Sequence, residues 1–141
     1  MNKLLGYIEL DLSTGVIPVK IGCYTLEKFC ESYGIGLSEI GSVFEVKQFE
    51  DENGNPKTST IPKDPIKFLS LILFHGANYA SKLGGGKEFI VENAYEWVDE
   101  IGLNTPIAIK VMATFIGSIM NGGRPVKEIE EPGKKKEEQD L

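Results

Sequence analysis

The longest run of apolar positions, residues 65–82, predicts a helix around which the rest of the chain is arranged. Asp64 can cap its first turn, Pro65 suits the first helical position, and the glycines at 84–86 end it. Apolar side chains cover most of its circumference, which is typical of a helix in the centre of a core or at a shared interface. Its polar interruptions and flanks exclude a membrane span.

Two strands are predicted before residue 22 from a different pattern, the alternation of apolar and polar residues. The alternation runs over 7–12 and again over 16–21, with turn chemistry at Ser13-Thr14-Gly15 between them. Pro18 places the second strand at an edge or introduces a bulge. Because a two-stranded ribbon alone is marginal in water, we expect it to pack on the helices or to pair with a neighbouring subunit.

Apolar stripes at helical spacing predict four more helices. They span residues 26–33, 39–44, 92–101 and 106–120. These elements together predict a mainly α fold, a small helical domain of about five helices with an N-terminal β-hairpin. The chain then divides into a β-ribbon at 1–22, a helical domain at 23–122 and a disordered tail at 123–141, which is charged and almost without large apolar groups.

The segment 49–63 is rich in Asp, Asn, Gly, Pro, Ser and Thr, which indicates a surface loop. A second hairpin remains an open alternative here. In it, residues 44–49 would pair with 57–61 around Asn53-Gly54.

Composition narrows the function classes. A formal charge of −6 over 141 residues disfavours a nucleic-acid binder that works by neutralising phosphates. The N-terminal residues before position 7 do not form a signal peptide, so we expect a cytosolic protein and no membrane partner. Cys23 and Cys30 have no second Cys or His pair, and we interpret them as small hydrophobes rather than a disulfide or metal site.

The candidate catalytic motifs fail on inspection. His75 is the only histidine and lies in the apolar central helix, so we expect it to pack rather than to catalyse. The glycines before Lys87 do not form a phosphate loop. The first glycine and the Ser/Thr of that motif are missing, and no strand is predicted before it. The acidic pattern that starts at Asp51 has Pro56 where a calcium loop needs glycine. The sequence thus predicts no enzyme, no cofactor and no metal.

The last predicted helix has more apolar residues than one packing face requires. One stripe contains Ala108, Met112, Phe115 and Ile119, and a neighbouring stripe contains Ile109, Ala113, Ile116 and Met120. Either the helix is central in a small bundle, or part of it binds another copy or an apolar client, for which methionine is well suited. For the second interpretation the candidate contact residues are Phe74, Met112, Phe115, Ile116 and Met120, and we expect Phe115→Asp to weaken the association.

Several segments, in this order after the ribbon, resemble the tail assembly chaperones of long-tailed bacteriophages and prophages. They are Tyr24–Glu31 (YTLEKFCE), Gly34–Ile40 (GIGLSEI), Pro65–Ala77 (PIKFLSLILFHGA) and Tyr95–Leu103 (YEWVDEIGL). The likeness covers roughly residues 7–120 and is a pattern of short helices rather than a catalytic signature. The segment 49–63 looks like an insertion relative to this pattern.

The resemblance implies a non-enzymatic protein of the host cytoplasm that is absent from the mature virion. Such chaperones bind the tape measure protein, keep it soluble, assist assembly of the tail tube protein around it, and often form homo-oligomers. An alternative is a structural head–tail connector or tail-completion protein, which would be present in the particle.

Overall fold

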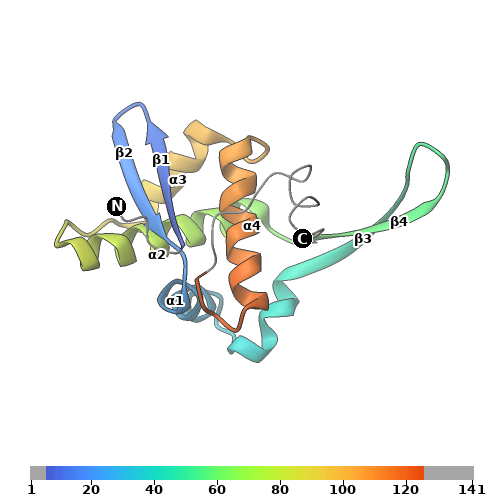
Figure 1. Cartoon of the computed structure of the whole chain (residues 1–141), viewed down its shortest axis with the longest axis horizontal. Coiled ribbons are helices and arrows are strands. Elements are labelled where there is room, and N and C mark those ends of the chain that lie inside the picture. The colour runs from blue at the N-terminus through green and yellow to red at the C-terminus, as the bar shows by residue number, and fades with distance from the viewer. Residues whose placement is uncertain (1–5, 126–141) are drawn as a thin grey trace, which may run out of the picture.

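The computed structural model describes residues 6–125, which form five helices and two antiparallel β-hairpins (Figure 1). In chain order the elements are β1 (Tyr7–Leu12), β2 (Gly15–Lys20), α1 (Cys23–Tyr33), the 3₁₀ helix η1 (Leu37–Val43), β3 (Phe44–Glu50), β4 (Pro56–Pro62), α2 (Pro65–Gly84), α3 (Val91–Ile101) and α4 (Pro106–Met120). The predicted tail at 123–141 lies outside the described residues from position 126 onward.

The prediction of a mainly α fold is wrong. Helices account for 53% of the described residues and strands for 22%, in two separate two-stranded sheets, so the fold is mixed α+β. The difference comes from residues 44–62, where the structure adopts the second hairpin that the sequence left as an alternative to a loop. The register pairs Phe44 with Pro62 at one end and Glu50 with Pro56 at the other.

The turn of this second hairpin explains why a polar segment becomes a hairpin. One carboxylate oxygen of Asp51, Oδ1, accepts hydrogen bonds from the amides of Asn53 and Asn55, both at 2.9 Å. Gly54 has a φ of 80°, a conformation that glycine adopts without steric cost. Asx-turn chemistry therefore closes the chain on itself, with no help from a hydrophobic core.

The predicted N-terminal strands are confirmed as β1 and β2, which pair from Tyr7–Lys20 to Leu12–Gly15. Their inner face is buried, and it packs on α2 rather than standing alone. The approach is close at Gly76, because a Cβ there would lie 2.5 Å from Cγ1 of Val19 and 3.2 Å from the carbonyl oxygen of Lys20. This contact joins the ribbon to the helices in one core.

The central helix is confirmed as α2, with the predicted cap. The Asp64 side chain accepts a hydrogen bond from the amide of Lys67, and Gly85 ends the helix in the left-handed conformation. The core beside it contains three fully buried aromatic rings, Phe29 of α1, Phe68 of α2 and Phe115 of α4, with ring centroids 4.7–5.6 Å apart. Helices α1, α2 and α4 therefore meet at one aromatic cluster.

The other predicted helices are present with small differences. α3 and α4 lie within one residue of their predicted bounds, whereas α1 begins at Cys23, three residues earlier than expected. The short helix predicted from residue 39 is the 3₁₀ helix η1. Within residues 6–125, no helix is both long and apolar enough to cross a membrane.

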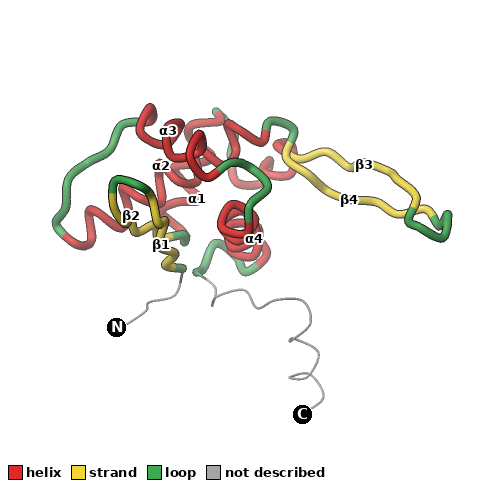
Figure 2. Tube along the Cα trace, turned by 90° about the horizontal axis from the view of Figure 1, so that it is seen from above, coloured by secondary structure: helices red, strands yellow, loops and turns green. Residues whose placement is uncertain are grey.

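The β3–β4 hairpin, residues 44–62, is called the arm below. It extends away from the body of the molecule, as both views show (Figures 1 and 2). Only its base is partly covered, where the ring of Phe44 lies edge-on to that of Phe68 at 5.3 Å. The remainder of the arm is open to solvent on both faces.

Candidate functional site

Helix α4 packs on the body mainly through one face. The buried residues of this inner face recur at helical spacing, and they are Ala108, Val111, Thr114, Phe115 and Ser118. Phe115 has no exposed surface, and its ring centroid lies 4.7 Å from that of Phe29. In Figure 2 α4 lies at one edge of the body, and Ile109 and Met120, on the side of the helix away from Phe115, are exposed.

The opposite face of α4 carries a second apolar row, which we call the outer stripe. It consists of Ile109, Met112, Ala113, Ile116 and Met120. Ile109 is 55% exposed and Met120 is 82% exposed. The three residues between them are partly buried, and two of these, Met112 and Ile116, pack against the edge of the core. At a rise of 1.5 Å per residue the stripe is about 16 Å long. It can therefore accept a partner helix of about three turns.

The structure separates the sequence-predicted candidates into different groups. Met112, Ile116 and Met120 belong to the outer stripe. Phe115 is a core residue, so Phe115→Asp would put a charge into the aromatic cluster and unfold the protein instead of testing an interface. Phe74 lies on α2, where it is partly buried against the core beside the His75 ring, 4.7 Å away.

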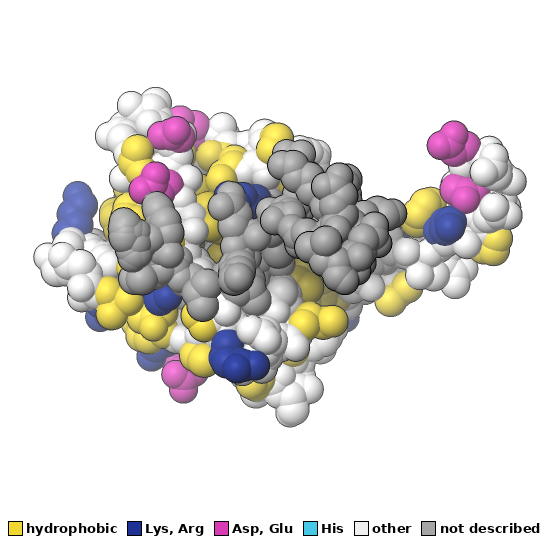
Figure 3. All heavy atoms as spheres, in the orientation of Figure 1, with side chains coloured by type: hydrophobic (Ala, Val, Ile, Leu, Met, Phe, Trp, Pro, Cys, Tyr) yellow, Lys and Arg dark blue, Asp and Glu magenta, His cyan; other side chains and the backbone are white. Residues whose placement is uncertain are grey.

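Sequence reasoning missed Ile109 as a candidate, although its spacing of seven and eleven residues from Ile116 and Met120 could have identified it. It also missed Val46 and Phe49 of the arm, which are 64% and 50% exposed. No local signal marks these two residues, because the composition around them is typical of a loop. In the space-filling view, hydrophobic side chains reach the surface on both the body and the arm (Figure 3).

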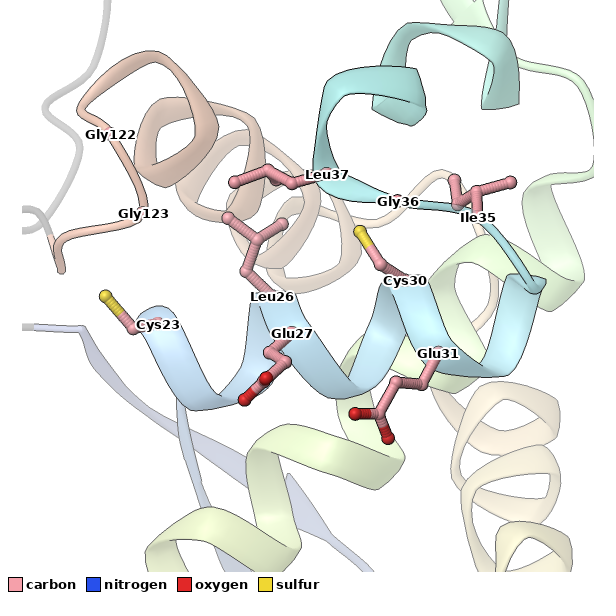
Figure 4. Close-up of a pocket in the computed structure, with 10 residues that line it drawn as sticks. All are labelled: Cys23, Leu26, Glu27, Cys30, Glu31, Ile35, Gly36, Leu37, Gly122 and Gly123. Atoms are coloured by element: carbon pink, nitrogen blue, oxygen red, sulfur yellow. The ribbon is translucent and has the colours of Figure 1, made fainter.

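A pocket of about 450 Å³ lies just beyond the C-terminal end of α4 (Figure 4). It is lined by Cys23, Leu26, Glu27, Cys30, Glu31, Ile35, Gly36, Leu37, Gly122 and Gly123. Leu26 and Cys30 point from α1 toward the segment 35–37, while Glu27 and Glu31 point to the other side of α1 (Figure 4). The interior is therefore apolar, and the carboxylates lie at the margin.

The turn after α4 forms one wall of this pocket, and it requires glycine. Gly123 has a φ of 88°, and a Cβ there would lie 3.4 Å from Sγ of Cys23 and 3.5 Å from Cδ2 of Leu26. Burial raises the pKa of the Cys30 thiol, which keeps it protonated and a weak nucleophile. No group of three or more potential metal ligands occurs among residues 6–125. The pocket is thus suited to an apolar side chain.

The polar contact of His75 is a 2.8 Å hydrogen bond between its Nε2 and Oγ of Ser32 on α1. Its pKa is lowered to about 4, mainly by burial and further by Lys28, while Glu31 opposes the shift. An imidazole with this pKa is a poor general base near neutral pH. The pair connects α1 to α2, as expected for a packed histidine.

In comparisons with known proteins, no protein-family model, no curated protein and no solved structure matches the chain. The functional assignment therefore depends on the resemblance and on the surface of this chain.

Proposed function

We propose that this protein is a non-enzymatic tail assembly chaperone of a long-tailed phage or prophage, and that it binds an apolar helix of the tape measure protein through the outer stripe of α4. The observation that carries the proposal is the exposure of Ile109 and Met120, at 55% and 82%, on a helix whose other face already supplies the core. An apolar row of this kind is typical of a surface that covers a partner helix.

The energetics suit a transient complex. Full burial of one large apolar side chain contributes about 1.5–3 kcal/mol, so covering the remaining exposed parts of Ile109 and Met120 contributes roughly 3 kcal/mol together. Association costs at least about 4 kcal/mol in lost translational and rotational freedom. A single stripe therefore binds weakly unless the partly buried residues and the pocket contribute. Weak binding allows tail tube subunits to displace the chaperone from its client.

The pocket and the charge support the same function. The pocket beside Leu26 and Leu37 is a second apolar surface that can take one side chain of a client. Leu37 is itself 54% exposed. The net charge of −6 keeps a complex of chaperone and client dispersed by mutual repulsion.

Co-expression with a tape measure protein of a long-tailed phage or prophage tests the proposal. We expect the wild-type chain to keep that protein in the soluble fraction, and Ile109→Asp and Met120→Asp each to lose this effect. Leu83→Asp on α2 is the matched control, because Leu83 is also a helical residue, 57% exposed, and lies outside the stripe. Circular dichroism would verify that all three variants fold.

Two outcomes contradict the proposal at different levels. If all three variants solubilise the client equally, the outer stripe is not the client site. If the wild-type chain has no effect on the client, or if it is a stoichiometric component of purified particles, the chaperone function is wrong. Presence in particles would favour the alternative of a head–tail connector or tail-completion protein.

A further inference from the structure

The arm is a two-stranded ribbon with an available edge. In the part of the chain that is described, β3 and β4 pair only with each other, so each has an outer row of backbone groups without a strand partner. β4 begins and ends with proline, Pro56 and Pro62, which cannot donate to a neighbouring strand. β3 contains no proline. The outer edge of β3 is therefore the one that can add a strand.

The arm also lacks the support that a hairpin usually needs. An isolated two-stranded ribbon is marginally stable in water, and stability requires a third strand or packing against another element. Beyond its base, the arm is exposed on both faces, including Val46 at 64% and Phe49 at 50%. A third strand along β3 would add backbone hydrogen bonds and cover these side chains.

We infer that the arm is a dimerisation element, in which β3 pairs antiparallel with β3 of a second copy, centred on Val46. In this register Val46 lies opposite the partner's Val46, and Glu45 lies opposite the partner's Lys47. By two-fold symmetry Lys47 also lies opposite the partner's Glu45. Directly opposite residues point to the same face of a sheet, so each of these pairs can touch.

The charge pattern of β3 selects this register over its neighbours. Centring the pair on Glu45 or on Lys47 would place two like charges directly opposite each other at the centre. Centring it on Gln48 would place Glu45 opposite the partner's Asp51. Among these four registers, the one centred on Val46 has no like-charge pair and gains two opposite-charge pairs.

The geometry of the single chain is compatible with this pairing. Glu45 Oε2 and Lys47 Nζ lie 3.9 Å apart on the same face of the arm, and both side chains are exposed, at 42% and 59%. They are therefore free to reach across to a second strand. In the same register, Phe44 lies opposite the partner's Gln48. The inference does not rest on the proposed function, because it is argued from the open edge and the charges of β3 alone. The family resemblance implies homo-oligomers but gives no interface.

A charge-exchange experiment tests the register. The dissociation constant of the dimer would be measured by sedimentation for the wild-type chain, Glu45→Lys, Lys47→Glu and an equimolar mixture of the two variants. Each variant alone places like charges opposite each other and should dimerise about tenfold or more weakly than wild type. In the mixture, the lysine introduced at position 45 of one variant faces the glutamate introduced at position 47 of the other, so both cross-strand pairs are again of opposite charge. The mixture should therefore form a heterodimer of near wild-type affinity.

The mixture distinguishes pairing between chains from the contact within one chain. Both variants lose the internal contact between positions 45 and 47, and mixing them does not restore it. Glu96→Lys on α3 makes the same charge change away from the arm and should dimerise as wild type does. A wild-type chain that stays monomeric at ~100 µM, single variants with unchanged affinity, or a mixture that remains weak would each overturn the inference.

Discussion

Replacing Gly76 with alanine tests how closely the β1–β2 hairpin must approach α2. A Cβ at this position would lie 2.5 Å from Cγ1 of Val19, whereas carbon atoms in contact are normally about 3.5–4.0 Å apart. The carbonyl oxygen of Lys20, at 3.2 Å, restricts movement on a second side. Val19 is fully buried, so its side chain has little room to turn away.

Two opposing effects determine how much Gly76→Ala changes the free energy of unfolding. Alanine is favoured over glycine inside a helix by about 1 kcal/mol. Overpacking of a well-filled core costs about 1–3 kcal/mol. Since the obstruction includes backbone as well as a side chain, we expect the upper part of that range and a net loss of roughly 1–2 kcal/mol in the free energy of unfolding. Gly84→Ala is the matched control, because Gly84 lies in the same helix with nothing within 4 Å of its Cβ position.

Urea denaturation followed by circular dichroism at the helix band measures both variants. We expect Gly84→Ala to match or exceed wild-type stability and Gly76→Ala to fall below it. Val19→Ala should destabilise the wild-type protein by opening a cavity but cost much less in the Gly76→Ala background, where it removes the clash. If Gly76→Ala is as stable as Gly84→Ala, or if the two substitutions at 19 and 76 are additive, the hairpin does not rest on α2 as described.

Two further predictions concern His75 and the cysteines. The pKa of His75 is about 4 in the native protein and 6.5 ordinarily, so the native state favours the neutral ring. Its contribution to stability is complete above pH 6.5 and is lost as the pH falls through 4. Urea titrations at several pH values should show this slope in wild type and not in His75→Gln, and an equal slope in both would contradict the assignment. A thiol reagent should modify exposed Cys23 quickly and buried Cys30 only after unfolding, and simultaneous modification of both would show that Cys30 is accessible in the native state.

The hairpin at 44–62 shows where prediction from sequence was limited. Its residues are mostly polar and its apolar residues, such as Val46 and Phe49, do not form one continuous buried face, so periodicity could not distinguish a strand from a loop. The local signal was the turn at Asn53-Gly54, which is typical of a hairpin. Whether residues 44–62 form a hairpin or a loop also depends on pairing between residues distant from the turn. No local pattern encodes that pairing.

Helix α4, which carries the candidate site, shows a similar limit of prediction from sequence. The composition of residues 106–120 was sufficient to predict a helix with apolar side chains on two faces. It could not tell which face is buried, because the inner face includes Thr114 and Ser118 and is therefore less apolar than the outer stripe. The packing of α4 on the aromatic rings of Phe29 and Phe68 decided that Phe115 lies inside and Met120 outside.

Local chemistry by itself determined where the main helices and the first hairpin occur, because caps, glycine stops and apolar spacing act within a few residues of each other. Asp64 at the start of α2 and Gly85 at its end are examples, and both occupy the predicted positions. Tertiary structure alone decided the orientation of each apolar face and the exposure of the arm. Whether a side chain is buried depends on which residues pack against it, and those residues are distant in the sequence.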